Sequence, residues 1–390
     1  MFDKSPTQVP ASLKWQQNGI RTGFTIEKLD LRSRPILKGA EATNTFEFIP
    51  IVDVSNVFSP DLEVRKKLAA EIGRAATEVG FFYAVNPPVD IRLMDESFAV
   101  IEKFFALPLE IKKYIFTNSP CFKGYMPSKA LEKSAPDRET FSVGSDFSEP
   151  EQHFIKKAAP GSVALNQWPD DELPEFKKVF YEYYKQCYAF AKGLIHSFAL
   201  ALELEETSFD EFFNAPLTDV VIHRYFPVPD RKDYEELLFP HADFCAFTFL
   251  LNQRDIPGLE VLNANGIWVP APPIEHAFIV NTGAYFELLS NSKFPSTVHR
   301  VRTNLGMERF SFPIFFSPDP GCTVRPHPAL IKAGETPKHT PQHIGKRYIS
   351  ALAKNAPDHP WVKKLKASGI KEEDYRWELL SQPFPELNGA

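Results

Sequence analysis

Long hydrophobic runs are missing from this chain of 390 residues. No segment approaches the roughly 18 consecutive apolar residues that a membrane-spanning helix needs, and Met1 to Lys4 do not open a signal peptide. Positive charge is not in excess either: the formal net charge is -6 and the pI is near 6.0, so nothing favours binding to nucleic acid or to an anionic membrane. We therefore expect a soluble, cytoplasmic protein with neither a nucleic-acid nor a membrane partner.

Cysteine and glycine are also scarce. The cysteines, four in all and with no Cys-x-x-Cys pair, argue against a disulfide framework or a zinc site and favour free thiols. The 18 glycines contrast with 35 phenylalanines, a composition that suits a large β core around an aromatic-lined cavity. The length allows one large domain with additions, or two small domains.

His241 and Asp243 are the first candidates for chemistry. Residues i and i+2 of a strand point to the same face, so these two side chains can reach one metal ion together. His299 from a distant strand would complete two imidazoles and one carboxylate, the facial triad of non-haem Fe(II) oxygenases. A His-x-Asp string is also common as a plain hydrogen-bonded pair, so the residues further along the chain decide between these interpretations.

The segment after His299 predicts a hairpin, with strands at 299–303 and 308–316 around a turn at 304–306. Arg309 and Ser311 share one face of the second strand. The opposite face carries Phe310, Phe312, Ile314 and Phe316. An arginine in so apolar a strand needs a partner, because a buried unpaired guanidinium is costly. That partner is either a bound carboxylate held with the help of the Ser311 hydroxyl, or an internal glutamate.

The order His-x-Asp, a second His, and Arg-x-Ser ten residues after it resembles the Fe(II)/2-oxoglutarate-dependent dioxygenase family, in its isopenicillin N synthase-like branch. Further matches lie at residues 49–53, 80–86, 257–261 and 281–283, and the resemblance covers about residues 46 to 320. Two departures leave the subfamily and the substrate open. Asn86 is followed by Pro87 and Pro88 where the family usually has His-Gly, and Ala284 stands where an acidic residue is common.

The resemblance implies that His241, Asp243 and His299 are the catalytic metal ligands for Fe(II). Arg309 and Ser311 would hold the far carboxylate of the cosubstrate 2-oxoglutarate. Tyr225, or Phe226 if the alignment shifts by one residue, would help to hold the cosubstrate or the substrate. With O2, such an enzyme oxidises an unactivated C–H of a small organic molecule by hydroxylation, desaturation or ring closure, here in specialised-metabolite or amino-acid-derived biosynthesis.

Two alternatives remain open. An isopenicillin N synthase-like Fe(II) oxidase would use no 2-oxoglutarate, and its Arg-x-Ser pair would hold a substrate carboxylate. A barrel that binds a small molecule without turnover would need no metal. No motif reports the oligomeric state.

The expected architecture is an all-β catalytic core with flanking helices: a double-stranded β-helix (jelly-roll) barrel buttressed by N-terminal helices. It divides into an N-terminal arm (1–45), an N-terminal α/β region (46–165), a long helix with the jelly-roll core (166–330), and a C-terminal helical segment covering the barrel mouth (331–390). An aromatic stripe predicts the long helix at 174–204. The two-residue period continued from Asp243 predicts that three side chains point into the substrate cavity: Cys245, Phe247 and Phe249.

Overall fold

The computed structural model describes residues 44–115, 123–127, 138–144, 166–214, 216–227, 236–253, 256–302, 306–355, 357 and 360–375. Except for residues 44 and 45, the predicted N-terminal arm lies outside this part of the chain. No helix within it is long and apolar enough to cross a membrane.

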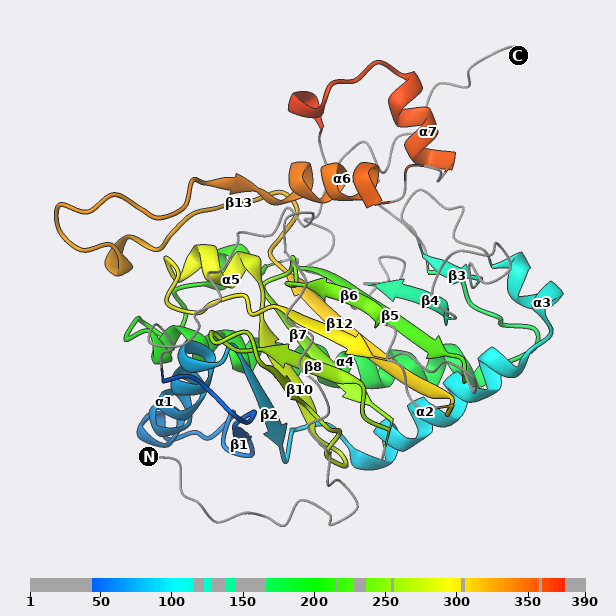
Figure 1. The fold of residues 1–390 in the computed structure, drawn as a ribbon, viewed down its shortest axis with the longest axis horizontal. Coiled ribbons are helices and arrows are strands. Elements are labelled where there is room, and N and C mark those ends of the chain that lie inside the picture. The colour runs from blue at the N-terminus through cyan, green and yellow to red at the C-terminus, as the bar shows by residue number, and fades with distance from the viewer. Residues whose placement is uncertain are drawn as a thin grey trace.

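Two β-sheets form the centre of the described structure (Figure 1). The larger has eight strands in the order β1 (Ile51–Asp53), β2 (Phe81–Val85), β10 (Phe278–Thr282), β7 (Phe247–Asn252), β12 (Arg309–Ser317), β5 (Leu217–Tyr225), β4 (Arg138–Gly144) and β3 (Gly124–Met126). The smaller has the order β6 (Glu236–His241), β11 (His299–Arg302), β8 (Leu259–Leu262) and β9 (Trp268–Pro270). All pairs in both sheets are antiparallel except β1 with β2.

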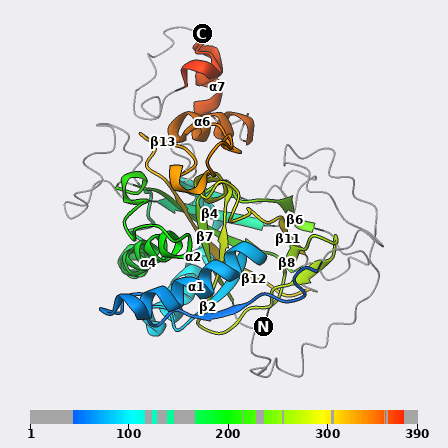
Figure 2. The same ribbon diagram turned by 90° about the vertical axis from the view of Figure 1, so that its left-hand side faces the viewer.

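Helices cover one face of the larger sheet, as Figure 2 shows from the side. They are α1 (Leu62–Glu78), α2 (Ile91–Ala106) and the long α4 (Pro174–Ala201). The predicted aromatic stripe of α4 packs on the sheet: the ring of Phe190 stacks on Phe249 at 4.9 Å between centroids, and Phe180 lies 6.5 Å from Phe312. The predicted β core with flanking helices is therefore confirmed, and the N-terminal region also supplies strands to both ends of the sheet.

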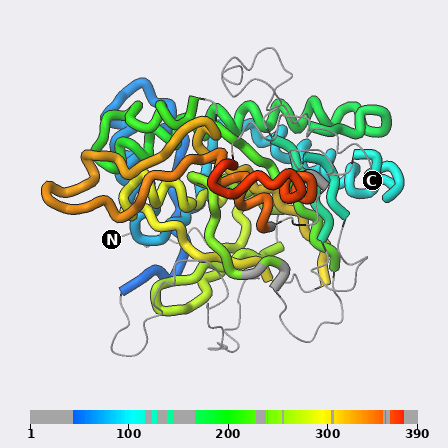
Figure 3. The backbone as a smooth tube through the Cα atoms, turned by 90° about the horizontal axis from the view of Figure 1, so that it is seen from above, coloured from blue at the N-terminus to red at the C-terminus, as the bar shows by residue number. Residues whose placement is uncertain are grey.

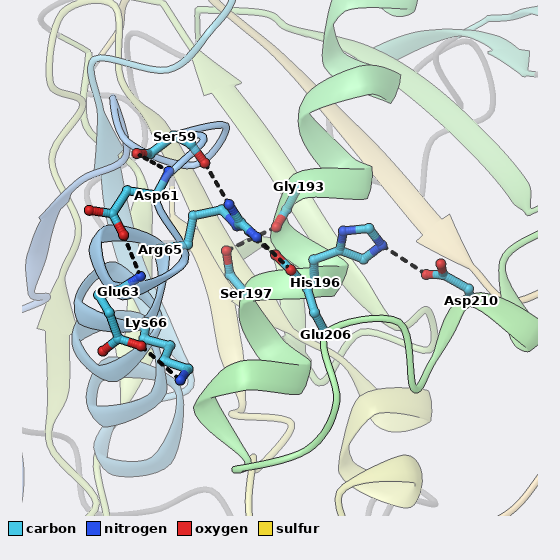
Figure 4. A network of polar contacts seen from close by, with 10 residues as sticks. All are labelled: Ser59, Asp61, Glu63, Arg65, Lys66, Gly193, His196, Ser197, Glu206 and Asp210. Atoms are coloured by element: carbon cyan, nitrogen blue, oxygen red, sulfur yellow. Dashed lines mark hydrogen bonds and ion pairs between the residues drawn. The ribbon is translucent and has the colours of Figure 1, made fainter.

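A polar network ties α1 to the chain that follows α4 (Figure 4). Nε and Nη2 of Arg65 each donate to one carboxylate oxygen of Glu206 at 2.7 Å, and Nη1 donates to the Ser59 carbonyl oxygen at 2.6 Å. On α4 itself, His196 contacts Asp210 at 3.0 Å. A bidentate pair of this kind fixes an angle as well as a distance, so it orients α1 relative to the segment that follows α4.

The remaining elements lie around this core. They are α3 (Leu109–Tyr114), η5 (Asp210–Phe212), α5 (Ala284–Leu289), β13 (Thr323–Val324), η6 (Pro328–Leu330), β14 (Gln342–His343), α6 (Ile344–Asn355), α7 (Pro360–Ala367) and η7 (Glu372–Asp374). Figure 3 looks down on α6 and α7, which lie over one end of the sheets. The guanidinium of Arg347 on α6 stacks 4.3 Å from the ring centroid of Phe244. Helix α6 therefore contacts the residue that follows Asp243, while its role as a cover remains a prediction.

The predicted hairpin after His299 is wrong. Strand β11 pairs with β6 and β8 in the smaller sheet, whereas β12 pairs with β5 and β7 in the larger one. The predicted turn at 304–306 lies, except for residue 306, outside the described residues. The hydrogen-bonding edges of both strands are taken by partners distant in sequence, which turn residues do not report.

Candidate active site

Two histidines meet where β6 and β11 pair. His241 is the last residue of β6 and lies directly across the ladder from His299, the first residue of β11. Their ring centroids are 4.3 Å apart. The ring of Phe81 from β2 meets His299 edge-on at 5.2 Å. Cross-strand neighbours on one face are close enough for both imidazoles to reach one ion.

Asp243 completes the cluster from the chain just beyond β6. Its Oδ1 lies 3.7 Å from Nε2 of His241 and 3.6 Å from Nε2 of His299. Its Oδ2 accepts hydrogen bonds from Thr248 Oγ1 at 2.5 Å and from Asn281 Nδ2 at 2.7 Å. The two donors hold the carboxylate so that its other oxygen faces the imidazoles.

The electrostatics of this cluster favour an ionised carboxylate. Burial by itself would raise the pKa of Asp243, but His299, His241 and the hydrogen bonds from Asn281 and Thr248 outweigh burial, and the pKa is lowered. Nδ1 of His299 lies 3.1 Å from the Thr297 carbonyl oxygen, an acceptor that requires a proton on Nδ1 and leaves Nε2 as the free ligand atom.

The cluster is partly open to solvent. The side chain of His241 is 29% exposed, whereas those of His299 and Asp243 are 8% and 6% exposed. An ion held here could therefore be approached from the His241 side. A candidate ligand atom from each of the three residues lies within 4.8 Å of the other two.

Arg309 is the first residue of β12 in the larger sheet, and only 1% of its surface is exposed. Nη2 donates to Oδ1 of Asn252 at 2.6 Å, and the guanidinium lies 5.2 Å from the ring centroid of Tyr225. Nε and Nη1 are buried and have no hydrogen-bond partner in the part of the chain that the structure describes. Burial lowers the pKa of this guanidinium, with Tyr225 opposing that effect. The internal glutamate that the sequence left open as a partner is not among the described contacts.

Thr248, Asn252 and Arg309 lie on one face of the larger sheet, and we call it the site face. It is the face opposite α4, and β5, β7 and β12 contribute Tyr225, His223, Thr248, Asn252, Arg309 and Ser311 to it. Ser311 pairs in register with Asn252 on one side and with His223 on the other. The structure thus brings Ser311 and Tyr225, both predicted site residues, to the same face as Arg309.

The predicted orientation of two of the three pocket residues is wrong. Phe247 stacks on Phe316 and Phe249 on Phe190, in the core between the sheet and α4. The thiol of Cys245 contacts Thr248 Oγ1 at 3.2 Å, and its place in the substrate cavity stays a prediction. Residues 242–246 form a connection between the two sheets rather than a strand, so the two-residue period does not carry over from Asp243 to β7.

Sequence reasoning missed the residues that support the candidate ligands and Arg309. Thr248 and Asn252 occupy the positions of β7 that alternate with the two phenylalanines, and Asn281 pairs with Thr248 in register. The polar residues of β7, spaced by four in an apolar strand, were the available signal. Gly283 lets the chain after β10 approach the connection that carries Asp243, since a Cβ there would collide with the Cys245 carbonyl oxygen.

Two imidazoles and one carboxylate around a common point suit Fe(II), and a buried guanidinium with unused donors suits the carboxylate of a small acid. Comparison with known proteins agrees. A family model described as non-haem dioxygenase in morphine synthesis N-terminal matches residues 49–171, and that of the 2OG-Fe(II) oxygenase superfamily matches residues 217–318. A 2-oxoglutarate-Fe(II) type oxidoreductase, ppzC, of Metarhizium majus is 34% identical over 289 residues, covering 69% of this chain and 77% of that protein. The chain belongs to the 2OG-Fe(II) oxygenase superfamily.

Solved structures of this superfamily share the fold. Full-length Neurospora crassa T7H in complex with alpha-KG and thymine aligns with a TM-score of 0.70 at 24% identity, covering 80% of this chain and 98% of that one. JOX2 in complex with 2OG, Fe and JA aligns with a TM-score of 0.64 at 26% identity, covering 82% and 90%. As a member of the 2OG-Fe(II) oxygenase superfamily, the protein is an oxidoreductase whose family uses Fe(II), 2-oxoglutarate and O2, which confirms the predicted family, enzyme class and cofactors.

Proposed function

We propose that His241, Asp243 and His299 bind Fe(II), and that Arg309 binds the far carboxylate of 2-oxoglutarate. The protein would then oxidise an unactivated C–H of a small organic molecule, by hydroxylation, desaturation or ring closure in a biosynthetic pathway. We also interpret the two sheets as the double-stranded β-helix of the family, with the ligands at its mouth. The observation that carries this proposal is the buried guanidinium of Arg309, which has no carboxylate partner among the described residues and keeps Nε and Nη1 unsatisfied.

The physical argument concerns the cost of that charge. Removing a guanidinium from water without a counter-ion destabilises the folded protein by several kcal/mol. A bound anion offsets that desolvation penalty. Nε and Nη1 of Arg309 keep unused N–H donors in the plane of the guanidinium, and these can donate to the oxygens of a bound carboxylate. Tyr225 and Ser311 lie on the same face and can add hydrogen bonds to that anion.

The chain's own residues then position and protect the reactants. The chemistry supplied by bound iron and 2-oxoglutarate is oxidation with loss of carbon dioxide and formation of succinate. Thr248 and Asn281 orient the Asp243 carboxylate, and the Thr297 carbonyl sets the His299 tautomer. The aromatic core behind β7 keeps water away from that side of the site.

The decisive experiment measures succinate formed from 2-oxoglutarate by the Fe(II)-loaded protein in air. Arg309→Met keeps an unbranched side chain about as long as the aliphatic stem of arginine and removes the charge. We expect it to raise the 2-oxoglutarate concentration for half-maximal rate about 30-fold or more, since losing one partner of a buried charged pair costs about 2–5 kcal/mol. Arg302→Met, where the arginine is partly exposed and contacts Glu260, is the matched control and should behave as wild type.

Two results would count against this proposal. Equal 2-oxoglutarate dependence in wild type and Arg309→Met would remove Arg309 from the cosubstrate site. Absence of succinate, with iron bound and an organic compound still oxidised, would favour the oxidase without 2-oxoglutarate, in which Arg309 holds a substrate carboxylate.

A further inference from the structure

Arg138 is a second arginine on the site face. It is the first residue of β4 and pairs in register with Tyr225 of β5, which pairs on its other side with Arg309 of β12. Figure 1 shows these three strands side by side. Neighbouring strands are about 4.8 Å apart, so the Cα atoms of the two arginines are roughly 10 Å apart, with Tyr225 between them.

The side chain of Arg138 points to the site face. Two residues further along β4, Thr140 contacts Nδ1 of His223 through its hydroxyl at 3.1 Å, and residues two apart on a strand share a face. The intervening Glu139 points the other way, where it accepts hydrogen bonds from Lys112 and Arg224. Arg138 thus belongs with His223 and not with the acidic network behind the sheet.

Arg138 has no anion of its own among the described residues. Its Nη1 is buried and has no hydrogen-bond partner. Glu139 is used by Lys112, Arg224 and Tyr125. The charge of Arg138 also acts on His223. Burial is the largest cause that lowers the pKa of His223, and the positive charges of Arg138, Arg309 and His241 lower it further. The pKa lies well below its ordinary value, which keeps that imidazole neutral.

Two other carboxylates could have neutralised this arginine. Asp219 lies on the same face of β5, but it pairs with Lys123 and accepts from Tyr348. Asp243 faces His241 and His299. Among the described residues of the site face, the two arginines therefore lack a negative partner of their own.

In the proposed arrangement 2-oxoglutarate is committed to Arg309 and does not neutralise Arg138. Of its two carboxylates, one would lie toward His241, Asp243 and His299, and the other would bind Arg309. Tyr225 lies between the two arginines in register, so a carboxylate held by Arg309 is directed to that guanidinium. The guanidinium of Arg138, whose Nη1 is buried and unsatisfied, is left for a second acid.

We propose that Arg138 binds a carboxylate of the organic substrate, so that this enzyme acts on a small carboxylic acid. This inference rests on the proposed function of the same site. The acid group would lie beyond Tyr225, and the C–H to be oxidised would lie on the side of His241. Arg138 is thus a specificity-determining residue, and a neutral analogue of the substrate should leave its charge unpaired.

The test measures binding, not turnover. Anaerobic protein loaded with Fe(II) and saturated with 2-oxoglutarate is titrated by calorimetry with aliphatic and aromatic monocarboxylic acids, each paired with its primary amide. We expect the acids that bind to wild type to do so at least about 10-fold more tightly than their amides. Arg138→Gln should remove that preference, Arg138→Lys should restore part of it, and the exposed control Arg325→Gln should keep it.

The affinity for 2-oxoglutarate is measured first with the same samples and should be unchanged in Arg138→Gln. A library in which no acid binds wild type more tightly than its amide overturns the proposal, as does a preference that survives in Arg138→Gln. A loss of 2-oxoglutarate affinity in Arg138→Gln also overturns it, since Arg138 would then belong to the cosubstrate site. Failure of wild type to bind 2-oxoglutarate would instead refute the proposed function itself.

Discussion

The two oxygens of the Asp243 carboxylate have different environments. Oδ2 accepts from Thr248 and Asn281, while Oδ1 faces His241 and His299. Because the hydrogen bonds fill one oxygen, rotation of the carboxylate away from the imidazoles would break both of them. The position of a ligand atom is thus set by residues that never touch the metal, as is common at metal centres.

Asn281→Ala tests this arrangement at the scale of one residue. Losing one of the two donors should weaken Fe(II) binding about 10- to 100-fold while the fold is retained. Anaerobic Fe(II) titration by calorimetry measures the affinity. The matched control is Asn263→Ala, another buried asparagine, which donates to the Phe46 carbonyl oxygen away from the cluster. Equal weakening in both variants would show that Asn281 has no special role at the metal.

The sequence predicted the cluster itself but not its support. His241, Asp243, His299 and Arg309 are recognisable by type and order. Asn281 supports a carboxylate 38 residues earlier in the chain, and this contact exists only because β10 pairs with β7 in one register. A register between strands distant in sequence depends on the whole sheet and is not contained in a local pattern.

At the scale of elements, the connection at 242–246 decides which side chains reach the site. It carries the chain from β6 in one sheet to β7 in the other, so alternation restarts at Phe247. Extrapolating the period from Asp243 placed the phenylalanines of β7 in the cavity, whereas Thr248 and Asn252 face it. A sequence pattern does not report how the first residue of β7 is turned relative to the preceding strand.

Phe247→Ala should therefore act on stability and not on binding. The ring stacks 5.2 Å from Phe316 and lies 5.8 Å from Phe198 of α4, fully buried, so its removal should cost about 3–5 kcal/mol of unfolding free energy. Denaturant unfolding measures the loss, and 2-oxoglutarate affinity of the folded variant should match wild type. Phe48→Ala, at a residue 57% exposed, is the control that should leave stability nearly unchanged. Full stability of Phe247→Ala together with altered ligand binding would show that Phe247 lines the cavity.

At the scale of the whole molecule, the candidate metal site joins the two sheets. The smaller sheet supplies His241 and His299, and the larger supplies Thr248 and Asn281, which hold Asp243 on the connection between them. An ion bound by all three ligands would therefore link strands that otherwise belong to separate hydrogen-bond ladders. Separation of the sheets on unfolding would have to release that ion.

Metal binding should accordingly raise the thermal midpoint of the entire protein. At a free Fe(II) concentration 100 times its dissociation constant, binding to the folded state alone adds about 2.7 kcal/mol, or about 3 °C for a chain of this size. Anaerobic calorimetric scans with Fe(II) and with a chelator measure the difference. Asp243→Ala should abolish the shift, whereas Asp210→Ala, which removes a carboxylate that contacts His196 on α4, should retain it. Stabilisation by a ligand requires that the folded site hold the ligand. A thermal midpoint that Fe(II) does not change would therefore contradict metal binding by these three side chains. A shift that persists in Asp243→Ala would contradict it as well.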